Sequence, residues 1–371
     1  MMRIIIGTFH IFKLCFLWLK YSVLILFQKE SVEQFLEKKE AKTLVFTHIL
    51  GGGTEQYVKN NFYKKDYLIV RKVAYLDKDL FFLIEDKINN KTIYLRFNTL
   101  NKLFSKNWNS IVINSLCWYA DISEILILCV KAKIANPNMN MLYLLHDFHC
   151  ICPNQNLFTD GFYCNLQCEK HKCKYLILEW RNTWQKFLEK CDEIRCFSKS
   201  SKEILMTVYK TLDGEKITVI PHNMSYSKFT TIKIEEKNTP VFGVVGACQL
   251  EIKGNKVLKT ILKNIPENIP FVFVGTKKSQ LKTNRKNVIF LGKYRHDELQ
   301  DILEKKNVTH IIFPSVWPET FSYVVSEIMQ MNLPIMCFNI GAQAEKVSKY
   351  NKGIVCESVE DMIKKIKQNI K

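Results

Sequence analysis

The sequence lacks a small-residue cleavage site of the A-x-A type after its apolar N-terminal stretch, residues 1–27. Because secretory signal peptides end in such a site, we expect none here. The chain has 13 cysteines, an odd number that argues against a framework of paired disulfides. Both features favour the cytoplasm, a reducing compartment in which thiols stay unpaired or bind metal.

Acidic residues are scarce relative to basic ones, with 36 Asp and Glu against 54 Lys and Arg, giving a net charge of +18. This balance favours anionic partners such as nucleic acid, acidic lipid or phosphorylated substrates. The lysines are dispersed along the chain, which equally fits an evenly basic surface. A helix-turn-helix pattern and a stripe of mixed aromatic and basic residues are both missing, so we expect no nucleic-acid partner. A basic nucleic-acid-binding protein remains a distant alternative.

Residues 1–27 form the longest apolar segment, and residues 28–40 follow as a polar helical linker. On a helix at about 100° per residue, the polar residues of the first segment fall within a sector of about 100°. They are Arg3, His10, Lys13 and Lys20. A broad apolar face with a basic edge predicts a helix lying in a membrane interface. A spanning helix and a helix packed on the first domain are the alternatives, and lysines near the bilayer centre argue against the former.

A length of 371 residues predicts two domains after this N-terminal region of residues 1–40. The first, residues 41–225, begins with a buried strand at residues 43–50, followed by Gly51, Gly52 and Gly53 and then a helix. Thr54 is a plausible N-cap of that helix. A glycine loop between a strand and a helix lets backbone N–H groups approach a phosphate, although a simple tight turn has the same pattern.

Further apolar runs at residues 80–86, 91–97, 110–119, 140–146, 193–197 and 216–220 predict more strands. The first two suit a hairpin around residues 87–90. Strands that alternate with helices predict a parallel, doubly wound sheet, whose ligands bind at the carboxyl ends of the strands. His146 lies at such an end and is a candidate site residue. Asp77 and Asp79 resemble a metal-binding carboxylate pair, but no phosphate loop is near them and we interpret them as a solvated turn.

A loop rich in cysteine follows, with Cys152, Cys164, Cys168 and Cys173 separated by gaps of eleven, three and four residues. Four thiolates can form a tetrahedral structural zinc site. The spacing is looser than paired C-x-x-C motifs, so a loop of free thiols is the alternative interpretation.

Residues 226–371 repeat the alternation of apolar strands and helices and predict a second doubly wound domain. Its first strand ends at Gly246, and Lys253 with Gly254 precedes the next helix. A lysine there can reach a diphosphate as a point charge.

The segment PSVWPETFSYVVSE, residues 314–327, places Glu319 before a predicted helix and Glu327 about two turns into it, with seven residues between them. Thr320 can cap this helix, and its unpaired N–H groups offer a diphosphate site. These groups lie near Phe321, Ser322 and Tyr323. A carboxylate further along can accept hydrogen bonds from ribose hydroxyls. Two incidental acids on a solvated helix face are the alternative.

At these residues the chain resembles the retaining, family-four type of nucleotide-sugar glycosyltransferases, in particular bacterial transferases that build O-antigen and capsule polysaccharides. The resemblance covers about residues 42–371 and rests on segments that occur in the expected order. They are FTHILGGGTEQYV, HDFHCICPNQNL, FSKSSKEIL, VIPHN, PSVWPETFSYVVSE and LPIMCFNIGAQAEKV. It implies two facing Rossmann-like domains of the GT-B type, the first for the acceptor and the second for the donor.

The resemblance also implies roles for individual residues. Glu327 would bind the nucleotide ribose, Glu319 the donor sugar, and Lys253 the diphosphate. The loop of Gly51–Gly53 would approach the diphosphate from the other domain, and His146 would lie by the transferred sugar. No metal ion or other cofactor would be required for catalysis.

One departure from the family pattern follows Gly246. The family often has an arginine after this glycine, whereas this chain has Ala247 and Cys248 in a loop that is one residue longer. The positive charge on the diphosphate would then come from Lys253 alone.

We therefore expect a glycosyltransferase that moves a sugar from a nucleotide-diphosphate donor to a glycan or lipid-linked acceptor. It would work at the inner face of the cytoplasmic membrane as a peripheral protein. A sugar-nucleotide epimerase or hydrolase on the same fold is the main alternative, since either would use the donor without an acceptor.

Overall fold

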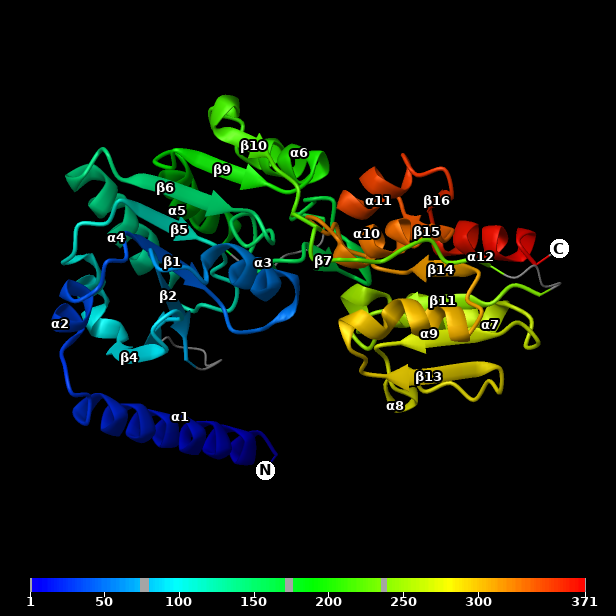
Figure 1. Ribbon diagram of the computed structural model, residues 1–371, viewed down its shortest axis with the longest axis horizontal. Helices are drawn as coiled ribbons and strands as arrows, with labels where there is room; N and C mark the ends of the chain where they lie inside the picture. The colour runs from blue at the N-terminus through cyan, green and yellow to red at the C-terminus, as the bar shows by residue number, and fades with distance from the viewer. Residues whose placement is uncertain (1, 74–79, 171–175, 235–238, 371) are drawn as a thin grey trace. The chain divides into compact units, whose positions relative to one another are not determined.

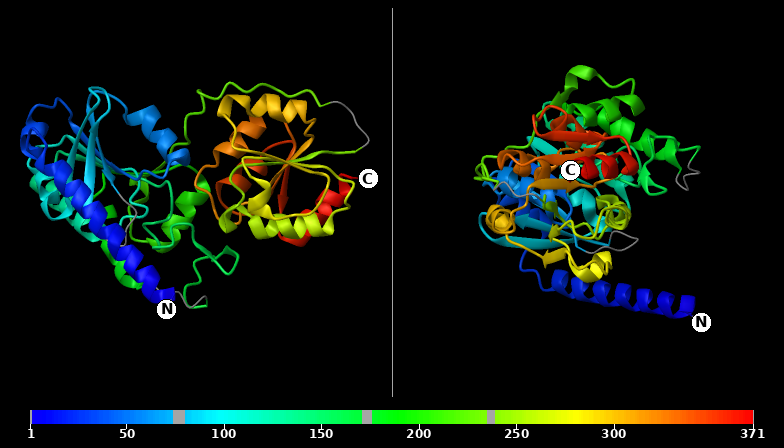
Figure 2. Two further views of the ribbon diagram at one scale, coloured as in Figure 1. Left: turned by 90° about the horizontal axis from the view of Figure 1, so that it is seen from below. Right: turned by 90° about the vertical axis from the view of Figure 1, so that its right-hand side faces the viewer.

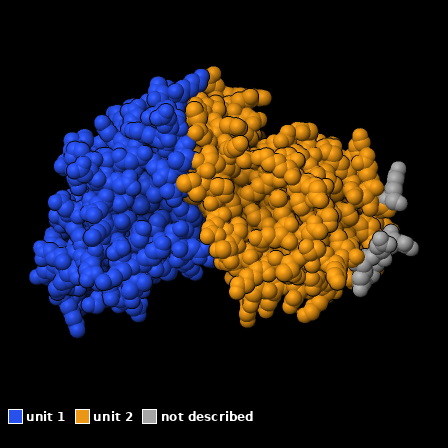
Figure 3. All heavy atoms as spheres, turned by 45° about the horizontal axis from the view of Figure 1, so that its top comes forward, with its two compact units in different colours: residues 1–153, 176–195, 208–218 blue, residues 154–175, 196–207, 219–371 orange. Residues whose placement is uncertain are grey.

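The computed structural model describes residues 2–73, 80–170, 176–234 and 239–370, with side chains of the first helix described from residue 14 onward. The chain divides into two compact units (Figure 3). Unit 1 comprises residues 1–153, 176–195 and 208–218. Unit 2 comprises residues 154–175, 196–207 and 219–371. Two short segments from the N-terminal part of the chain therefore belong to the unit that holds the C-terminus.

Unit 1 is built on an eight-stranded sheet of order β10-β9-β6-β5-β1-β2-β3-β4 (Figure 1). The strands are β1 (Thr43–Thr47), β2 (Tyr67–Lys72), β3 (Phe81–Asp86), β4 (Lys91–Arg96), β5 (Ser110–Ile113), β6 (Asn140–Leu144), β9 (Glu193–Cys196) and β10 (Ile217–Val219). β1 pairs in parallel with both β2 and β5, and β5 with β6. β3 and β4 pair antiparallel, which confirms the predicted hairpin. Leu44, Val45 and Phe46 are fully buried, as expected of a strand covered on both faces.

The helices of unit 1 connect these strands and continue the N-terminal region. They are α1 (Met2–Leu26), α2 (Val32–Glu37), α3 (Gly52–Phe62), α4 (Ile122–Ala135), α5 (Ile177–Leu188) and the 3-10 segments η1 (Phe97–Phe104) and η2 (Gly214–Lys216). α6 (Lys199–Val208), which lies in unit 2 except for its last residue, begins after Ser198, whose Oγ accepts a hydrogen bond from Ser201 N at 3.2 Å. That contact caps the helix.

Unit 2 is built on a six-stranded sheet of order β13-β12-β11-β14-β15-β16, parallel throughout (Figure 2). Its strands are β11 (Phe242–Val245), β12 (Phe271–Val274), β13 (Val288–Gly292), β14 (His310–Phe313), β15 (Ile335–Phe338) and β16 (Gly353–Cys356). Two rows of three strands run outward from the β11–β14 pair, which is the order of a Rossmann-like, doubly wound sheet. A two-stranded hairpin, β7 (Phe158–Thr159) with β8 (Phe162–Tyr163), also belongs to this unit.

Helices cover both faces of this sheet (Figure 2). α7 (Asn255–Asn264) and α12 (Val359–Gln368) pack on one face, in a core that includes Phe242, Val244 and Phe273. α9 (Leu299–Lys305), α10 (Tyr323–Gln330) and α11 (Gly341–Val347) pack on the other, in a core that includes Val245 and Val272. Short helical segments complete the unit: η3 (Glu251–Lys253), α8 (Lys278–Leu281) and η4 (His296–Glu298). Because neighbouring residues of a strand face opposite sides, continuous apolar strands supply both cores.

α1 packs along the outer strands of unit 1 (Figure 1). Its Tyr21 ring lies 5.5 Å from the ring of Phe81 and 5.4 Å from that of Tyr94. Within the described residues, none of the helices is both long enough and apolar enough to cross a bilayer. One face of α1 is therefore packed on the first sheet, as one of the alternatives from the sequence supposed.

Candidate functional site

The chemistry-bearing residues of unit 2 lie where the strand order of its sheet reverses, between β11 and β14. The loop of residues 246–254 leaves the carboxyl end of β11, and the loop of residues 314–322 leaves that of β14. Adjacent parallel strands bring these two loops to the same edge of the sheet. This reversal point is where doubly wound sheets bind their ligands.

Gly254 allows the two loops to touch. Its φ is +86°, and a Cβ built there would lie 2.2 Å from the carbonyl oxygen of Pro314. The backbone N–H of Val316 also donates to the carbonyl of Ile252 at 3.0 Å. Only glycine fits this backbone conformation and this close approach, so the Lys-Gly pair noted in the sequence has a structural cause.

Lys253 and Glu319 meet across this junction, Nζ to Oε1 at 2.5 Å. The Glu319 side chain is buried, and Ser315 Oγ also donates to its Oε1 at 3.1 Å. The Lys253 side chain is 34 % exposed. A partly exposed cation held on a buried carboxylate can exchange that carboxylate for an incoming anion. The structure thus brings together two residues that the sequence predicted for one site.

α11 holds the backbone of Glu319 from the other side. Gln343 Oε1 accepts a hydrogen bond from Glu319 N at 3.1 Å, and its Nε2 donates to the carbonyl of Trp317 at 2.8 Å. The N–H of Ala342 donates to the carbonyl of Glu319 at 2.8 Å. Sequence reasoning missed Gln343, although it lies in the quoted segment LPIMCFNIGAQAEKV.

We expect Gly341→Ala to destabilise the protein more than Gly292→Ala. Both glycines are left-handed, with φ of +61° and +65°, so both substitutions cost about 1–2 kcal/mol of backbone strain. Only at Gly341 does a Cβ also collide, at 2.6 Å from Pro318 Cα and 2.7 Å from Glu319 N. Chemical denaturation of the two variants measures the difference, and equal losses would show that the α11 contact does not position Glu319.

Helix α10 begins later than the sequence predicted. Its first residue is Tyr323 and its N-cap position is Ser322, whereas Thr320 was expected to cap it. The prediction was wrong because Ser322 has a left-handed backbone, φ +61° and ψ +94°, which delays the helical conformation. Glu327 therefore lies about one turn into the helix and not two. Thr320, Phe321 and Ser322 are all buried in the loop that precedes it.

Glu327 is buried, with 5 % of its side chain exposed, and His296 Nε2 lies 2.9 Å from its Oε1. Burial raises the pKa of Glu327, while the contact with His296 acts in the opposite direction. The His296 ring packs 5.6 Å from Tyr226 and 5.0 Å from Phe229. The alternative that Glu327 is an incidental acid on a solvated helix face is excluded by this burial. His296 was not anticipated, because it lies 31 residues away in sequence.

A second cation, Lys346 of α11, lies against the start of α10. Its Nζ donates to Ser326 Oγ at 2.6 Å and to the carbonyl of Ser322 at 3.2 Å, and lies 3.3 Å from the centre of the Phe321 ring. Burial lowers the pKa of Lys346 to about 7. Nearby carboxylates oppose that shift, and Glu319 has the largest effect among them. The region therefore combines buried acids with a buried cation, a setting typical of functional sites.

The glycine loop belongs to unit 1 and joins β1 to α3. Gly51 and Gly52 have φ of +79° and +71°, so the turn requires glycine for its backbone and not for lack of space. Gly51 is the N-cap position of α3, and Thr54, which was expected to cap it, lies inside the helix. Gly53 is also within the first turn. The strand, glycine loop and helix were correctly predicted.

His146 follows β6 in unit 1, at the carboxyl ends of neighbouring strands. Its Nε2 lies 2.9 Å from Asn114 Oδ1, and Asn114 Nδ2 donates to Thr47 Oγ1 at 2.9 Å. The rings of His146 and Tyr57 meet edge to face at 4.8 Å. His146 is buried in this network. Its position at a strand end agrees with the sequence, and its role stays a prediction.

The proposed zinc ligands are only partly described. Cys173 lies outside the described residues, as do Asp77 and Asp79. Among the residues that the structure describes, no group of three or more His, Cys, Asp or Glu side chains is placed to hold a metal ion. Cys152 and Cys164 are buried.

We expect stability to fall as the pH drops below about 6.5. Burial lowers the pKa of His48 to about 4 and of His149 and His222 to about 3. Between pH 6.5 and these lowered pKa values, the unfolded chain therefore binds more protons than the folded chain does. The free energy of unfolding is highest above pH 6.5 and falls as the solution is acidified. Each histidine contributes up to about 1.4 kcal/mol per pH unit. Unfolding curves between pH 7.5 and 5.5 test this, and His149→Gln should flatten the dependence; an unchanged slope would contradict the assignment.

Comparison with known proteins agrees with the fold. Residues 239–371 match a family model described as glycosyl transferases group 1. Among curated protein sequences, none matches the chain.

Solved structures of similar architecture include HepE of Anabaena in complex with UDP, at 14 % identity and a TM-score of 0.59 over 89 % of this chain and 90 % of that one. Sucrose-phosphate synthase of Thermosynechococcus elongatus matches at 15 % identity and a TM-score of 0.59, over 89 % of each chain. The lipopolysaccharide outer core galactosyltransferase WaaB matches at 14 % identity and a TM-score of 0.56, over 89 % of this chain and 91 % of that one.

At these identities the structures show the fold, two Rossmann-like parts of the GT-B type. The family match covers the Lys253, Glu319 and Glu327 region within unit 2. The chain therefore has a fold of the GT-B type, and its residues 239–371 match the glycosyl transferases group 1 model.

Proposed function

We propose that the chain transfers a sugar, with retention of configuration, from a nucleotide-diphosphate donor to a glycan or lipid-linked acceptor of a cell-surface polysaccharide. The observation that carries this proposal is the meeting of Lys253 with Glu319 at the point of strand reversal, with the buried Glu327 about one turn into the helix that follows. A cation, a helix N-terminus and a carboxylate on either side of that N-terminus match the parts of a sugar nucleotide.

Each part of the sugar nucleotide would contact a protein group that complements its charge or its hydrogen-bonding groups. The diphosphate would lie at the N-terminus of α10 and take Lys253 from Glu319, since a phosphate carries more charge than a carboxylate. Glu319, released from the cation, would then accept hydrogen bonds from hydroxyls of the sugar. Glu327 would accept hydrogen bonds from the ribose, on the oxygen that His296 leaves unoccupied.

Transition-state stabilisation in this proposal is electrostatic. Negative charge grows on the diphosphate as the bond to the sugar breaks, and Lys253 together with the N–H groups of α10 would offset it. Ala247 and Cys248 occupy the place where an arginine is frequent in the family that the chain resembles, and burial raises the pKa of Cys248 to about 12. Cys248 therefore stays neutral, and Lys253 carries the charge on this loop.

The nucleotide and the acceptor are proposed from the structural neighbours. HepE was solved with UDP-glucose as well as with UDP, which favours a UDP-sugar as the first donor to test. WaaB acts on the lipopolysaccharide outer core, which favours a surface polysaccharide. We place the enzyme in the cytoplasm at the inner face of the membrane, where sugar nucleotides and lipid-linked acceptors meet. Residues 226–371 would form the donor domain and residues 41–225 the acceptor domain, with Gly51–Gly53 and His146 in their predicted roles.

Product analysis tests the reaction against its main alternative. With UDP-sugar and a lipid-linked glycan, the proposal predicts a lengthened acceptor and free UDP in equal amounts. With donor alone it predicts little turnover, because the attacking hydroxyl is missing. Rapid formation of free sugar or of an epimerised donor without acceptor would favour a hydrolase or an epimerase.

A further inference from the structure

The face of α1 that points away from the sheet is apolar and exposed. At about 100° per residue, a set of its exposed apolar side chains falls within a sector of about 160°. They are Phe16, Leu19, Val23, Leu24 and Leu26, with Phe27 just after the helix, while Cys15 and Trp18 are exposed outside this sector. The exposed fraction reaches 75 % at Leu26 and 82 % at Phe27. Tyr21 and Ser22 lie on the opposite face, which is packed. A run of large apolar side chains of this length on one helix face needs a partner.

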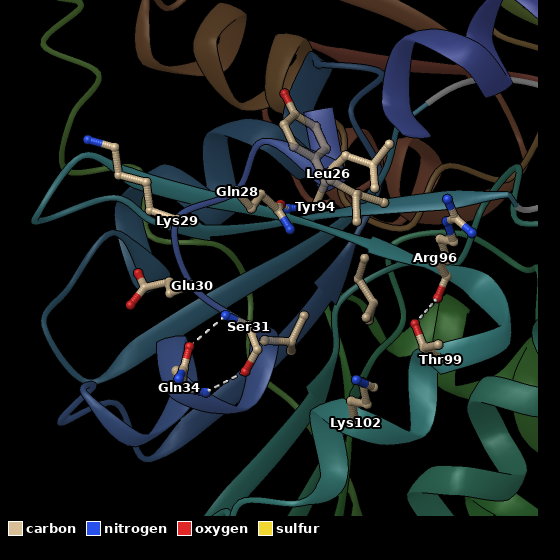
Figure 4. Close-up of a pocket in the computed structure, with 13 residues that line it drawn as sticks. Leu26, Gln28, Lys29, Glu30, Ser31, Gln34, Tyr94, Arg96, Thr99 and Lys102 are labelled. Carbon is tan, nitrogen blue, oxygen red and sulfur yellow. Dashed lines mark hydrogen bonds between the residues drawn. The ribbon is translucent and has the colours of Figure 1, made fainter. Parts of the chain in front are cut away.

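A cavity of about 560 Å³ lies at the C-terminal end of this face (Figure 4). Ile25 and Leu26 of α1 form part of its wall, so the cavity is continuous with the exposed apolar face. The rest of the wall comes from the α1–α2 connection, α2, β4 and η1, all within unit 1. Gln28 fixes this connection, since its Oε1 accepts a hydrogen bond from the backbone N–H of Tyr94.

The wall of this cavity is basic. Lys29, Arg96 and Lys102 lie on different sides of it (Figure 4). Lys102 pairs with Glu33 at 2.9 Å, and Glu30, the acid of the lining, pairs with Lys38 at 2.7 Å. Within the described part of the chain, neither Lys29 nor Arg96 forms an ion pair with an acidic side chain. Two positive charges of the wall are therefore not compensated.

Arg96 is the residue best placed to bind an anion. Its Nε is buried and makes no hydrogen bond to any described residue. Its guanidinium carbon lies 5.9 Å from the centre of the Trp18 ring, and its carbonyl accepts a hydrogen bond from Thr99 Oγ1 at 2.9 Å. A guanidinium held against an aromatic ring and missing one partner suits the fork-like geometry of a phosphate.

We propose that this cavity binds the phosphate of an anionic phospholipid headgroup while the exposed face of α1 lies in the acyl boundary of the bilayer. An apolar stripe beside a basic cavity matches the two parts of such a lipid, and a helix in the interface plane would bring both to the same depth. This inference builds on the membrane location proposed above, and not on the transfer reaction.

Vesicle sedimentation of the full-length chain tests the cavity directly. We expect binding to phosphatidylcholine vesicles that contain about one third phosphatidylglycerol, and much weaker binding to phosphatidylcholine alone. The pair Lys29→Gln with Arg96→Gln should lower the partition coefficient roughly 10- to 30-fold. The control pair Lys131→Gln with Lys210→Gln removes the same charge from exposed positions of unit 1 and should lower it less than about threefold. Equal losses in the two pairs would overturn the proposal.

A single substitution guards against misfolding, because Arg96 is partly buried. Lys29 is exposed in the connection between α1 and α2, so Lys29→Gln should keep the wild-type unfolding midpoint and still weaken anionic vesicle binding several-fold. Leu19→Gln with Leu26→Gln should abolish binding to both vesicle types. If that pair instead converts a dimer to a monomer in light scattering, a second copy covers the face and the lipid assignment is wrong.

Two further measurements make two distinctions. One distinguishes a free anion from a lipid headgroup as the ligand of the cavity, and the other distinguishes failure of this inference from failure of the proposed transferase function. The first measurement is the unfolding midpoint with inorganic phosphate. If phosphate raises the midpoint of the wild type as much as anionic vesicles do, and does not raise that of Arg96→Gln, the cavity is a site for free anions and the lipid assignment is wrong. A thermal shift with UDP on the same samples should be unchanged by the cavity substitutions. Vesicle binding without a UDP shift would leave this inference standing and count against the proposed transferase site.

Discussion

Lys253→Ala is expected to lower turnover by roughly 10²- to 10³-fold while the protein stays folded. The Lys253 ammonium is the charge that the loop after β11 brings to the start of α10, and it is held there by Glu319. Loss of one preorganised charge at a leaving group has effects of that size in other enzymes. The measurement is the initial rate of UDP release at saturating donor and acceptor.

Lys256→Ala is the matched control for this substitution. Lys256 lies three residues further along, in α7, with 72 % of its side chain exposed, and it pairs with Glu251. Its removal changes the net charge equally and should leave turnover within about twofold, since exposed pairs contribute little. Wild-type turnover in Lys253→Ala would remove Lys253 from the mechanism. If turnover falls equally in both variants, the net charge of this region matters and not a direct contact of Lys253 with the diphosphate.

Glu327→Ala is expected to weaken UDP binding by roughly 10²- to 10⁴-fold. A carboxylate that accepts hydrogen bonds from two ribose hydroxyls contributes about 1.5–3 kcal/mol for each bond, and about 1.4 kcal/mol corresponds to tenfold in affinity. Because burial already raises the pKa of Glu327, its ionised form is costly in the fold. We therefore expect the variant to unfold no earlier than the wild type.

Calorimetry with UDP and with its 2′,3′-dideoxy analogue isolates the ribose contact. The wild type should prefer UDP strongly, and Glu327→Ala should bind both about equally. Glu360→Ala, at an exposed position of α12, should keep the wild-type preference. A preference for UDP that persists in Glu327→Ala would assign the ribose to another group.

The local pattern predicted most of the strands and the order of the chemistry-bearing segments. β11, β12, β14 and β15 are uninterrupted apolar runs because both faces of each are buried, and such runs are visible in the sequence. Lys253, Glu319 and Glu327 could be found because each lies next to a strand end or at the start of a helix. β16 was not predicted, since its burial is only partial and its sequence, GIVC, is short, and the buried β2, YLIVRK, was not predicted either.

What the sequence could not predict are contacts between loops that are distant in the chain. The approach of Gly341 to Pro318, the hydrogen bonds of Gln343 to the Glu319 loop, and the pairing of His296 with Glu327 all depend on the folded sheet edge. The late start of α10 was not predicted either. Ser322 has a backbone conformation that serine rarely adopts, and the helix begins only after it.

The N-terminal helix illustrates how two interpretations of one pattern can both hold in part. A face of α1 packs on β3 and β4 through Tyr21, as expected of a helix buried on the first domain. The opposite face keeps the exposed apolar character expected of an interface helix. Hydrophobicity alone could not separate these faces, because both are apolar and only the fold assigns one of them to the sheet.

The most direct test of the account is a thermal-shift series with UDP, GDP, dTDP and their sugars on the wild type and on Glu327→Ala. A ligand at 100 times its dissociation constant stabilises a protein by about 2.7 kcal/mol, which is a shift of a few degrees. The account predicts that one nucleotide, UDP first, raises the unfolding midpoint of the wild type and leaves that of the variant unchanged. A series in which no nucleotide shifts the wild type, or in which one shifts both proteins equally, would contradict the donor site described for unit 2.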